Sequence, residues 1–266
     1  MIIVGERINA SRKRIARALD RRDAGRIEKE ARRQAECGAT YIDINAGTSV
    51  AKEVENLKWL AEVVSGAVEK PLCVDSANPE ALDAALPLNR VDRPMINSIT
   101  AEEKRIEGIL PLVKKYKAKV VALTMDDSGM PEDSDGRVAV AEKLRERLSA
   151  EGVPDDDIFF DVLIRPVSTD PSQAVHCLEA VRRIRGKYPE VHFMCGMSNV
   201  SFGLPKRKIL NRTFLTLLLA AGQDGAILDP TETDVSAALL ATSALLGQDD
   251  YCMEYISAER DGRLGE

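Results

Sequence analysis

The sequence has few of the residues that build many catalytic and metal sites. Its 266 residues include two histidines, one tryptophan and five cysteines, and aromatic residues make up 4%. A zinc site built on histidine, or a cysteine–histidine nucleophile, needs those side chains close together. His176 falls in an expected helix and His192 at the start of an expected strand, so we expect both to be structural. The sequence therefore favours a chemistry without a histidine base and without a bound metal.

Long apolar runs and an excess of basic residues are also missing. No stretch approaches the roughly 20 apolar residues of a membrane span. The first residues, MIIVGERIN, lack the long apolar core of a secretory signal. The net charge of −6 argues against a nucleic-acid partner, which needs a basic patch that we do not expect here. We therefore expect neither a membrane nor a nucleic acid as a partner.

The cysteines indicate a reducing compartment. None of the five forms a CxxC pair, so we expect buried, reduced thiols and a cytoplasmic protein. The cysteines are Cys37, Cys73, Cys177, Cys195 and Cys252.

Eight short apolar runs recur along the chain, and a helical pattern follows each of them. The runs are continuously apolar, which is typical of parallel strands buried on both faces. Eight such units within 266 residues predict a single (β/α)8 TIM barrel, one α/β domain over residues 1–266, with a doubly wound open sheet as the alternative. The expected strands are 2–5, 41–45, 71–75, 94–98, 119–125, 158–163, 192–197 and 225–229.

Polar residues end most of these expected strands. The carboxyl ends of barrel strands meet at one rim, where active sites are built. A buried polar group without a partner costs about 1–3 kcal/mol, so several on one rim indicate a ligand with many donors and acceptors. Carboxylates and amides suit a flat heterocycle with adjacent N–H and C=O groups. The rim residues are Asp43, Asn45, Asp75, Asn97, Ser98, Asp161, Ser198, Asn199 and Asp229.

Five stretches resemble the pterin-binding methyltransferases. They are GERIN (5–9), DINAG (43–47), CVDS (73–76), MINS (95–98) and GMSNVSFGLPKRKILNRTFL (196–215). The likeness runs from the first strand to about residue 255. It is greatest to the methyltetrahydrofolate:corrinoid/iron–sulfur protein methyltransferases, and the folate domain of cobalamin-dependent methionine synthase is similar. The resemblance implies a barrel, usually dimeric, with the pterin bound at the rim.

The same resemblance implies roles for individual residues. Asn199 would approach N5, the pterin nitrogen that bears the methyl group, and is the candidate catalytic residue. The residues implied in pterin binding are Asp75, Asn97, Asp161, Gly196, Ser198, Asn199 and Arg207.

Simpler roles remain open for several of these residues. Asp75 and Asp161 could cap neighbouring helices, and Arg207 could be a solvated cation between two lysines. Asn211 is most simply a helix cap. Phe202 stands where some relatives carry a polar side chain, so the further contacts of N5 stay open.

The resemblance implies transfer of the N5 methyl group between methyltetrahydrofolate and the cobalt of a corrinoid. Neither His176 nor His192 lies in the D-x-H-x-x-G pattern of corrinoid domains, so we expect a separate corrinoid protein. Two alternatives remain, a dihydropteroate synthase-like enzyme and a non-catalytic folate-binding subunit of a corrinoid complex. A synthase needs a pyrophosphate site, and no glycine-rich phosphate loop is evident. The apolar helices expected within 214–222 and 235–247 predict a homodimer.

Overall fold

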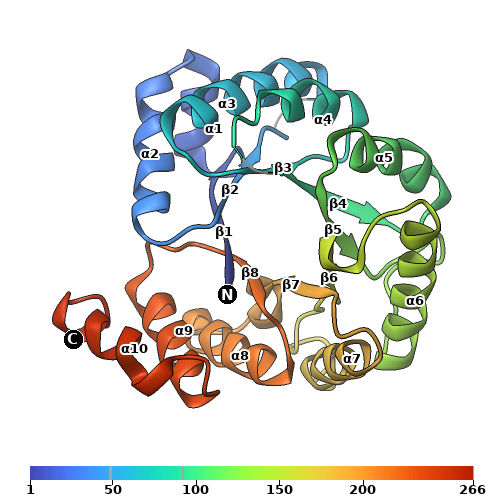
Figure 1. Ribbon diagram of the computed structural model, residues 1–266, viewed down its shortest axis with the longest axis vertical. Helices are drawn as coiled ribbons and strands as arrows, with labels where there is room; N and C mark the ends of the chain where they lie inside the picture. Colours follow the sequence, from blue (N-terminus) through green and yellow to red (C-terminus); the bar gives the residue numbers. More distant parts are fainter. Residues whose placement is uncertain (48–49, 92, 266) are drawn as a thin grey trace.

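Eight parallel strands close into a barrel in the computed structural model, which describes residues 1–47, 50–91 and 93–265 (Figure 1). Each strand pairs with the next along the chain, and β8 pairs with β1. This closure confirms the (β/α)8 barrel and excludes the open sheet. The strands are β1 (Ile2–Asn9), β2 (Tyr41–Asn45), β3 (Leu72–Asp75), β4 (Met95–Thr100), β5 (Lys119–Leu123), β6 (Ile158–Asp161), β7 (His192–Gly196) and β8 (Gly225–Leu228).

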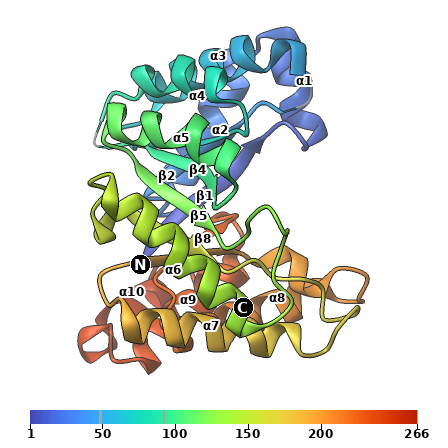
Figure 2. The ribbon, with the colours of Figure 1, turned by 90° about the vertical axis from the view of Figure 1, so that its right-hand side faces the viewer.

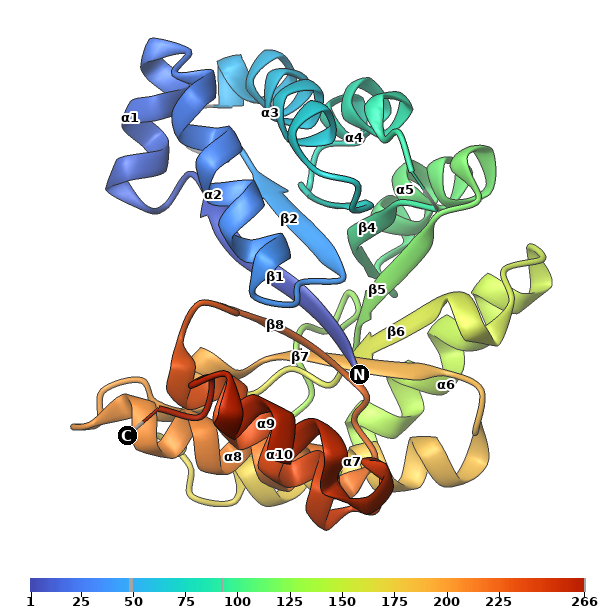
Figure 3. The same ribbon diagram turned by 60° about the vertical axis from the view of Figure 1, so that its left-hand side comes forward.

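Helices surround the strands, with α1–α5 around one half of the barrel and α6–α10 around the other (Figures 2 and 3). The α-helices are α1 (Lys13–Arg21), α2 (Ala24–Glu36), α3 (Glu53–Ala67), α4 (Pro79–Ala85), α5 (Glu103–Tyr116), α6 (Ser134–Ala150), α7 (Gln173–Lys187), α8 (Arg207–Ala221), α9 (Thr233–Leu245) and α10 (Met253–Arg260). Short 3-10 helices are η1 (Val50–Lys52), η2 (Leu86–Leu88), η3 (Asp155–Asp157), η4 (Met197–Ser201) and η5 (Asp250–Cys252). No helix among the described residues is long and apolar enough to span a membrane.

The barrel interior has an apolar layer near the amino ends of the strands and a polar layer beyond it. The apolar layer is a buried cluster of Val4, Tyr41, Cys73, Met95, Val121, Phe159 and Met194. Side chains alternate between the two faces of a strand, so the residues two positions further along also face inward. Those residues are Glu6, Asp43, Asp75, Asn97, Leu123, Asp161 and Gly196. Alternation along the strands therefore produces an apolar plug beneath a polar mouth.

Strand β1 runs to Asn9, beyond the expected end at residue 5, and contains a bulge. The register with β2 shifts between Gly5 and Ile8, so Glu6 and Arg7 together face Asp43 across the ladder. The backbone N–H of Arg7 donates instead to Gln34 Oε1 of α2, at 3.0 Å. A Cβ on Gly5 would lie 2.5 Å from that same oxygen, so a larger residue here would displace the Gln34 side chain from its contact with Arg7.

Two cysteine predictions were wrong. Cys73, Cys177 and Cys195 are buried, as expected, but Cys37 and Cys252 are exposed. Cys37 follows α2 and Cys252 is the last residue of η5, where the chain covers neither of them. All five are free thiols.

Candidate functional site

The strand ends place three of the predicted polar residues side by side. Asn45, Asp75 and Asn97 are direct neighbours in the register of β2, β3 and β4. The Asn45 amide donates to Asp75 Oδ2 at 2.9 Å, which fixes the orientation of that carboxylate. Burial raises the pKa of Asp75, and this hydrogen bond opposes the rise. The three side chains form a polar row that can offer both donors and acceptors to a ligand.

Asp161 joins β6 to β7 on another part of the mouth. Its Oδ1 accepts from the N–H of Leu163 at 2.8 Å, and its Oδ2 accepts from the N–H of Gly196 at 3.4 Å. The side chain is buried, and this burial raises its pKa to about 6. Asp161 therefore connects the strand ends and also carries a carboxyl that can change protonation near neutral pH.

Two further carboxyls face the interior, and one was missed from sequence. Asp43 is buried, its Oδ1 has no hydrogen-bond partner among the described residues, and burial and the Asp75 charge raise its pKa. Glu6, two positions beyond Val4, was missed because the strand was expected to end at residue 5. Burial raises its pKa to about 7, although Arg12 lies 3.5 Å away and opposes the rise. The mouth therefore contains carboxyl groups that keep their protons to a higher pH than exposed carboxyl groups do.

We predict that Glu6→Gln stabilises the protein at pH 8 and changes little at pH 4.5. A carboxyl with a higher pKa in the folded state binds its proton more tightly there. Its contribution to stability is therefore full below the unfolded value near 4.5 and is lost as the pH rises through about 7. Glutamine does not ionise and avoids this loss. Melting temperatures at both pH values, with Glu62→Gln on exposed α3 as control, test the prediction; an equal shift at both pH values would contradict it.

Ser198 and Asn199 are the exposed residues of the short helix η4, directly after β7. Among the described residues, the Asn199 side-chain amide has no hydrogen-bond partner, so it can turn toward a ligand. Arg207 holds the turn, because its guanidinium donates to the carbonyl oxygen of Ser198 and to Ser201 Oγ. The helix-cap prediction for Asn211 was wrong. Asn211 lies inside α8, and its Oδ1 accepts from Ser201 Oγ at 2.6 Å, because η4 folds back onto that helix.

Asp229 has protein partners at the rim. Its carboxylate accepts from Arg7 of β1 and from both the N–H and the hydroxyl of Thr231. Although burial acts in the opposite direction, these donors and the Arg7 charge lower its pKa. Asp229 is therefore a paired carboxylate that connects β1 to the segment after β8.

His192 lies at the amino end of β7, away from the mouth. Its Nδ1 pairs with Asp224 and its Nε2 with Asp156, and the ring stacks on Phe159. Both ring nitrogens therefore have protein partners. Among the described residues, no cluster of His, Cys, Asp and Glu is arranged to hold a metal ion.

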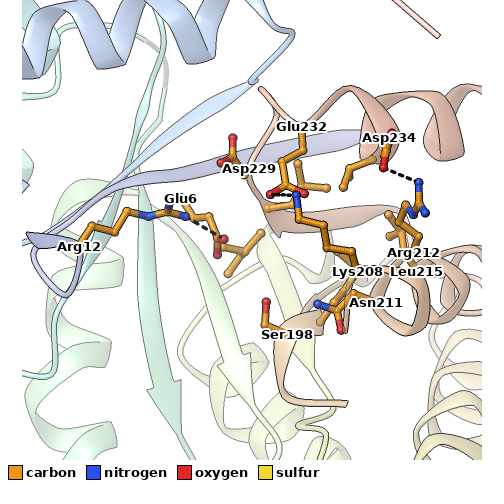
Figure 4. A pocket seen from close by; sticks show the side chains of 14 residues that line it. Glu6, Arg12, Ser198, Lys208, Asn211, Arg212, Leu215, Asp229, Glu232 and Asp234 are labelled. Carbon is orange, nitrogen blue, oxygen red and sulfur yellow. Dashed lines mark ion pairs between the residues drawn. The ribbon is translucent and has the colours of Figure 1, made fainter. Parts of the chain in front are cut away.

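A pocket of about 240 Å³ opens at the β7–β8–β1 side of the mouth (Figure 4). Glu6 and Ser198 line it, together with Lys208 and Arg212 of α8. Each of these two cations is paired, Lys208 with Glu232 and Arg212 with Asp234. Of the residues predicted at the rim, Ser198 and Asp229 line this pocket.

The profile of the family described as pterin binding enzyme matches residues 5–229. This match covers β2 to β8 in full, the second part of β1 and the whole polar mouth. The chain belongs to the pterin-binding enzyme family. The chain is similar to the methylcorrinoid:tetrahydrofolate methyltransferase of Eubacterium limosum, which is 38% identical over 100% of this chain and 98% of its own length. Methionine synthase of Mycobacterium tuberculosis is 30% identical over 85% of this chain, which corresponds to 20% of that longer protein.

Solved structures of other pterin-binding enzymes share the barrel. A dihydropteroate synthase of Yersinia pestis, bound to a pterin–sulfa conjugate, superposes with a TM-score of 0.70 and 17% identity over 92% of this chain and 93% of its own. The synthase of Xanthomonas albilineans, bound to 7,8-dihydropteroate, gives a TM-score of 0.69 and 20% identity over 94% of both chains. At this identity the likeness shows the common fold alone.

Proposed function

We propose that this protein transfers a methyl group between N5 of tetrahydrofolate and the cobalt of a corrinoid carried by a separate protein. The observation that carries the proposal is the full-length 38% identity to a methylcorrinoid:tetrahydrofolate methyltransferase. The polar mouth supports it. Asn45, Asp75 and Asn97 in one row, with Asp161 on β6, offer the donors and acceptors that a pterin edge requires.

In this proposal the carboxylates and amides bind and orient the pterin. Asp75 and Asp161 accept from its N–H groups, Asn97 donates and accepts, and the turn that begins at Gly196 brings Ser198 and Asn199 over the ring. Orientation has a large effect in a two-substrate transfer, because it replaces a search in solution with a fixed approach. Arg207 acts indirectly by holding that turn.

The mechanism also requires the transfer of a proton to or from N5. When methyltetrahydrofolate gives up its methyl group, N5 gains negative charge and takes up a proton. In the reverse direction, N5 of tetrahydrofolate loses its proton as it accepts the methyl group. Asn199 can donate a hydrogen bond that strengthens as this charge develops, which lowers the barrier. Asp161 and Glu6, whose pKa values are raised to about 6 and about 7, can exchange the proton through the mouth near neutral pH. The reduced cobalt of the corrinoid supplies the nucleophile, or the methylated cobalt the methyl donor.

A spectroscopic assay with free cobalamin tests the function in both directions. The protein is mixed with cob(I)alamin and methyltetrahydrofolate, or with methylcobalamin and tetrahydrofolate, and the corrinoid spectrum is followed. We expect enzyme-dependent conversion in both directions, because one site serves the forward and reverse steps. Folate binding without conversion would instead indicate the non-catalytic subunit. Binding of a pterin pyrophosphate in preference to methyltetrahydrofolate would indicate a dihydropteroate synthase.

We predict that Asp75→Ala and Asp161→Ala each weaken methyltetrahydrofolate binding. Each change leaves a pterin donor without its charged acceptor, at a cost of roughly 1.5–3 kcal/mol, or about tenfold to a hundredfold in Kd. Titration calorimetry measures the effect, with Asp127→Ala in the exposed loop after β5 as the control. Wild-type affinity in both variants would refute the assignment.

We also propose that the protein forms a homodimer through α8–α10. Most large apolar side chains that are exposed among the described residues lie there, including Leu217 of α8 and Leu245 of α9. Helix α9 is apolar on most of its surface, yet only Leu239 and Thr242 are buried in it. An exposed apolar surface of this kind is typical of a protein interface.

Sedimentation tests the dimer, which we expect at micromolar concentration. Leu217→Glu places a charge on the proposed interface and should give a monomer. Val175→Glu changes an even more exposed apolar residue, which lies on α7, and should leave the dimer intact. A monomeric wild-type protein would remove the proposal.

The free cysteines also support a reducing compartment, and we propose that the protein works in the cytoplasm.

A further inference from the structure

Helices α1 and α2 carry a strong positive charge on an acidic protein. Residues 12–33 contain ten Lys and Arg against four Asp and Glu, although the whole chain has a net charge of −6. The expectation that the chain has no basic patch was therefore wrong, because the overall charge conceals a local excess of cations. We call this surface the α1–α2 basic face.

A groove of about 450 Å³ runs along the basic face. Its lining is almost entirely cationic, and Glu30, which also lines it, is already paired with Arg7. Five of the lining cations have no carboxylate oxygen within 4.0 Å among the described residues. They are Lys13, Arg14, Arg26, Lys29 and Arg33. Cations that line one groove without an ion-pair partner among the described residues repel one another, so the groove is suited to an anionic ligand.

The groove begins at the mouth of the barrel. Arg12, which follows the carboxyl end of β1, lines both this groove and the mouth pocket that contains Glu6 and Ser198. Further along, Arg26, Lys29 and Arg33 follow one another at helical spacing on one side of α2. Cations therefore extend in a line from the mouth down the outside of the barrel.

We propose that this groove binds the oligo-γ-glutamate chain of a polyglutamylated folate whose pterin occupies the mouth. Folate joins its pterin through aminobenzoate to glutamate, and each added γ-linked glutamate contributes one carboxylate. A flexible chain with regularly spaced carboxylates matches a narrow line of cations that starts at the pterin site. The proposal rests on the proposed function, because it requires a folate in the mouth.

Affinity for folates of different tail length tests the proposal. Calorimetry compares methyltetrahydrofolate monoglutamate with its tetraglutamate at low salt. We expect the tetraglutamate to bind about tenfold more tightly, because three added exposed ion pairs each contribute a small free energy. The advantage should largely disappear at about 0.3 M salt, where charges are screened within several ångströms.

A charge reversal on the groove separates this site from general electrostatics. Lys29→Glu with Arg33→Glu should remove the tetraglutamate advantage and leave monoglutamate affinity unchanged, since neither residue contacts the mouth. The matched control reverses Lys70, which precedes β3 at the opposite end of the barrel, and Arg182 of α7. It makes the same change in net charge and should keep the advantage.

Each outcome has a distinct meaning. Equal affinity of the wild-type protein for both folates would overturn the groove proposal and leave the proposed function standing. A tetraglutamate advantage that survives the groove reversal would also overturn it, because the chain would then bind elsewhere. If neither folate binds, the proposed function fails as well.

Discussion

Replacing Arg137 by methionine is expected to lower the free energy of unfolding by about 3–5 kcal/mol. The Arg137 side chain is completely buried in α6. Its guanidinium donates to the carbonyl oxygens of Val162 and Leu163 after β6, to those of Glu132 and Asp133, and to Gln173 Oε1 of α7. Methionine occupies similar volume but leaves these buried acceptors without a donor.

Urea unfolding and thermal melting measure this effect, and the melting temperature should fall by roughly 10 °C. Arg182→Met, on the exposed side of α7, is the matched control and should change stability by less than about 0.5 kcal/mol. Folate affinity should fall together with stability, because Arg137 fixes the segment whose Leu163 N–H binds Asp161. An Arg137→Met protein with wild-type stability would show that water or a shifted loop satisfies these acceptors.

Asn199→Ala is expected to slow methyl transfer by about 10²–10³ while folate affinity changes much less. The amide is exposed and has no hydrogen-bond partner in the part of the chain that the structure describes, so it can donate to N5 as charge develops there. A contact that strengthens only in the transition state affects the rate under saturating substrate, whereas one made equally in the ground state affects binding.

Stopped-flow measurement of the transfer rate at saturating folate separates these cases. Asn211→Ala is the control for loop shape, because it removes the contact with Ser201 that holds η4 and leaves the Asn199 amide in place. We expect that control to lose stability and binding in parallel. An Asn199→Ala protein that transfers methyl at the wild-type rate once saturated would exclude the catalytic role.

The barrel could be predicted from sequence because its signal is local. Continuous apolar runs reveal strands buried on both faces, and the polar residue that ends each run can be read directly, as for Asp75 and Asp161. Glu6 could not be found in this way. The apolar run that marks β1 ends at Gly5, and the strand continues to Asn9 through a bulge whose Arg7 N–H is satisfied by Gln34, 27 residues away on α2.

The burial of Arg137 could not be predicted from sequence for the same reason. In the sequence it is one cation in a charged helix, and only packing against the β6–α7 connection makes it buried. Asn211 shows the reverse case, since a residue type typical of caps is used inside α8 for a tertiary contact. The α1–α2 basic face could have been found from sequence, had charge been counted by segment rather than over the whole chain.

The apolar plug beneath the polar mouth also bears on how this architecture diverges. The plug needs only the right volume of apolar side chains, and such cores accept many sequences. Dihydropteroate synthases can therefore share the barrel at 17–20% identity with this chain. The mouth lies at the other end of the same strands, so a change in ligand needs substitutions at strand ends and leaves the folding core intact. Selection for stability and selection for chemistry can thus proceed almost independently in one small molecule.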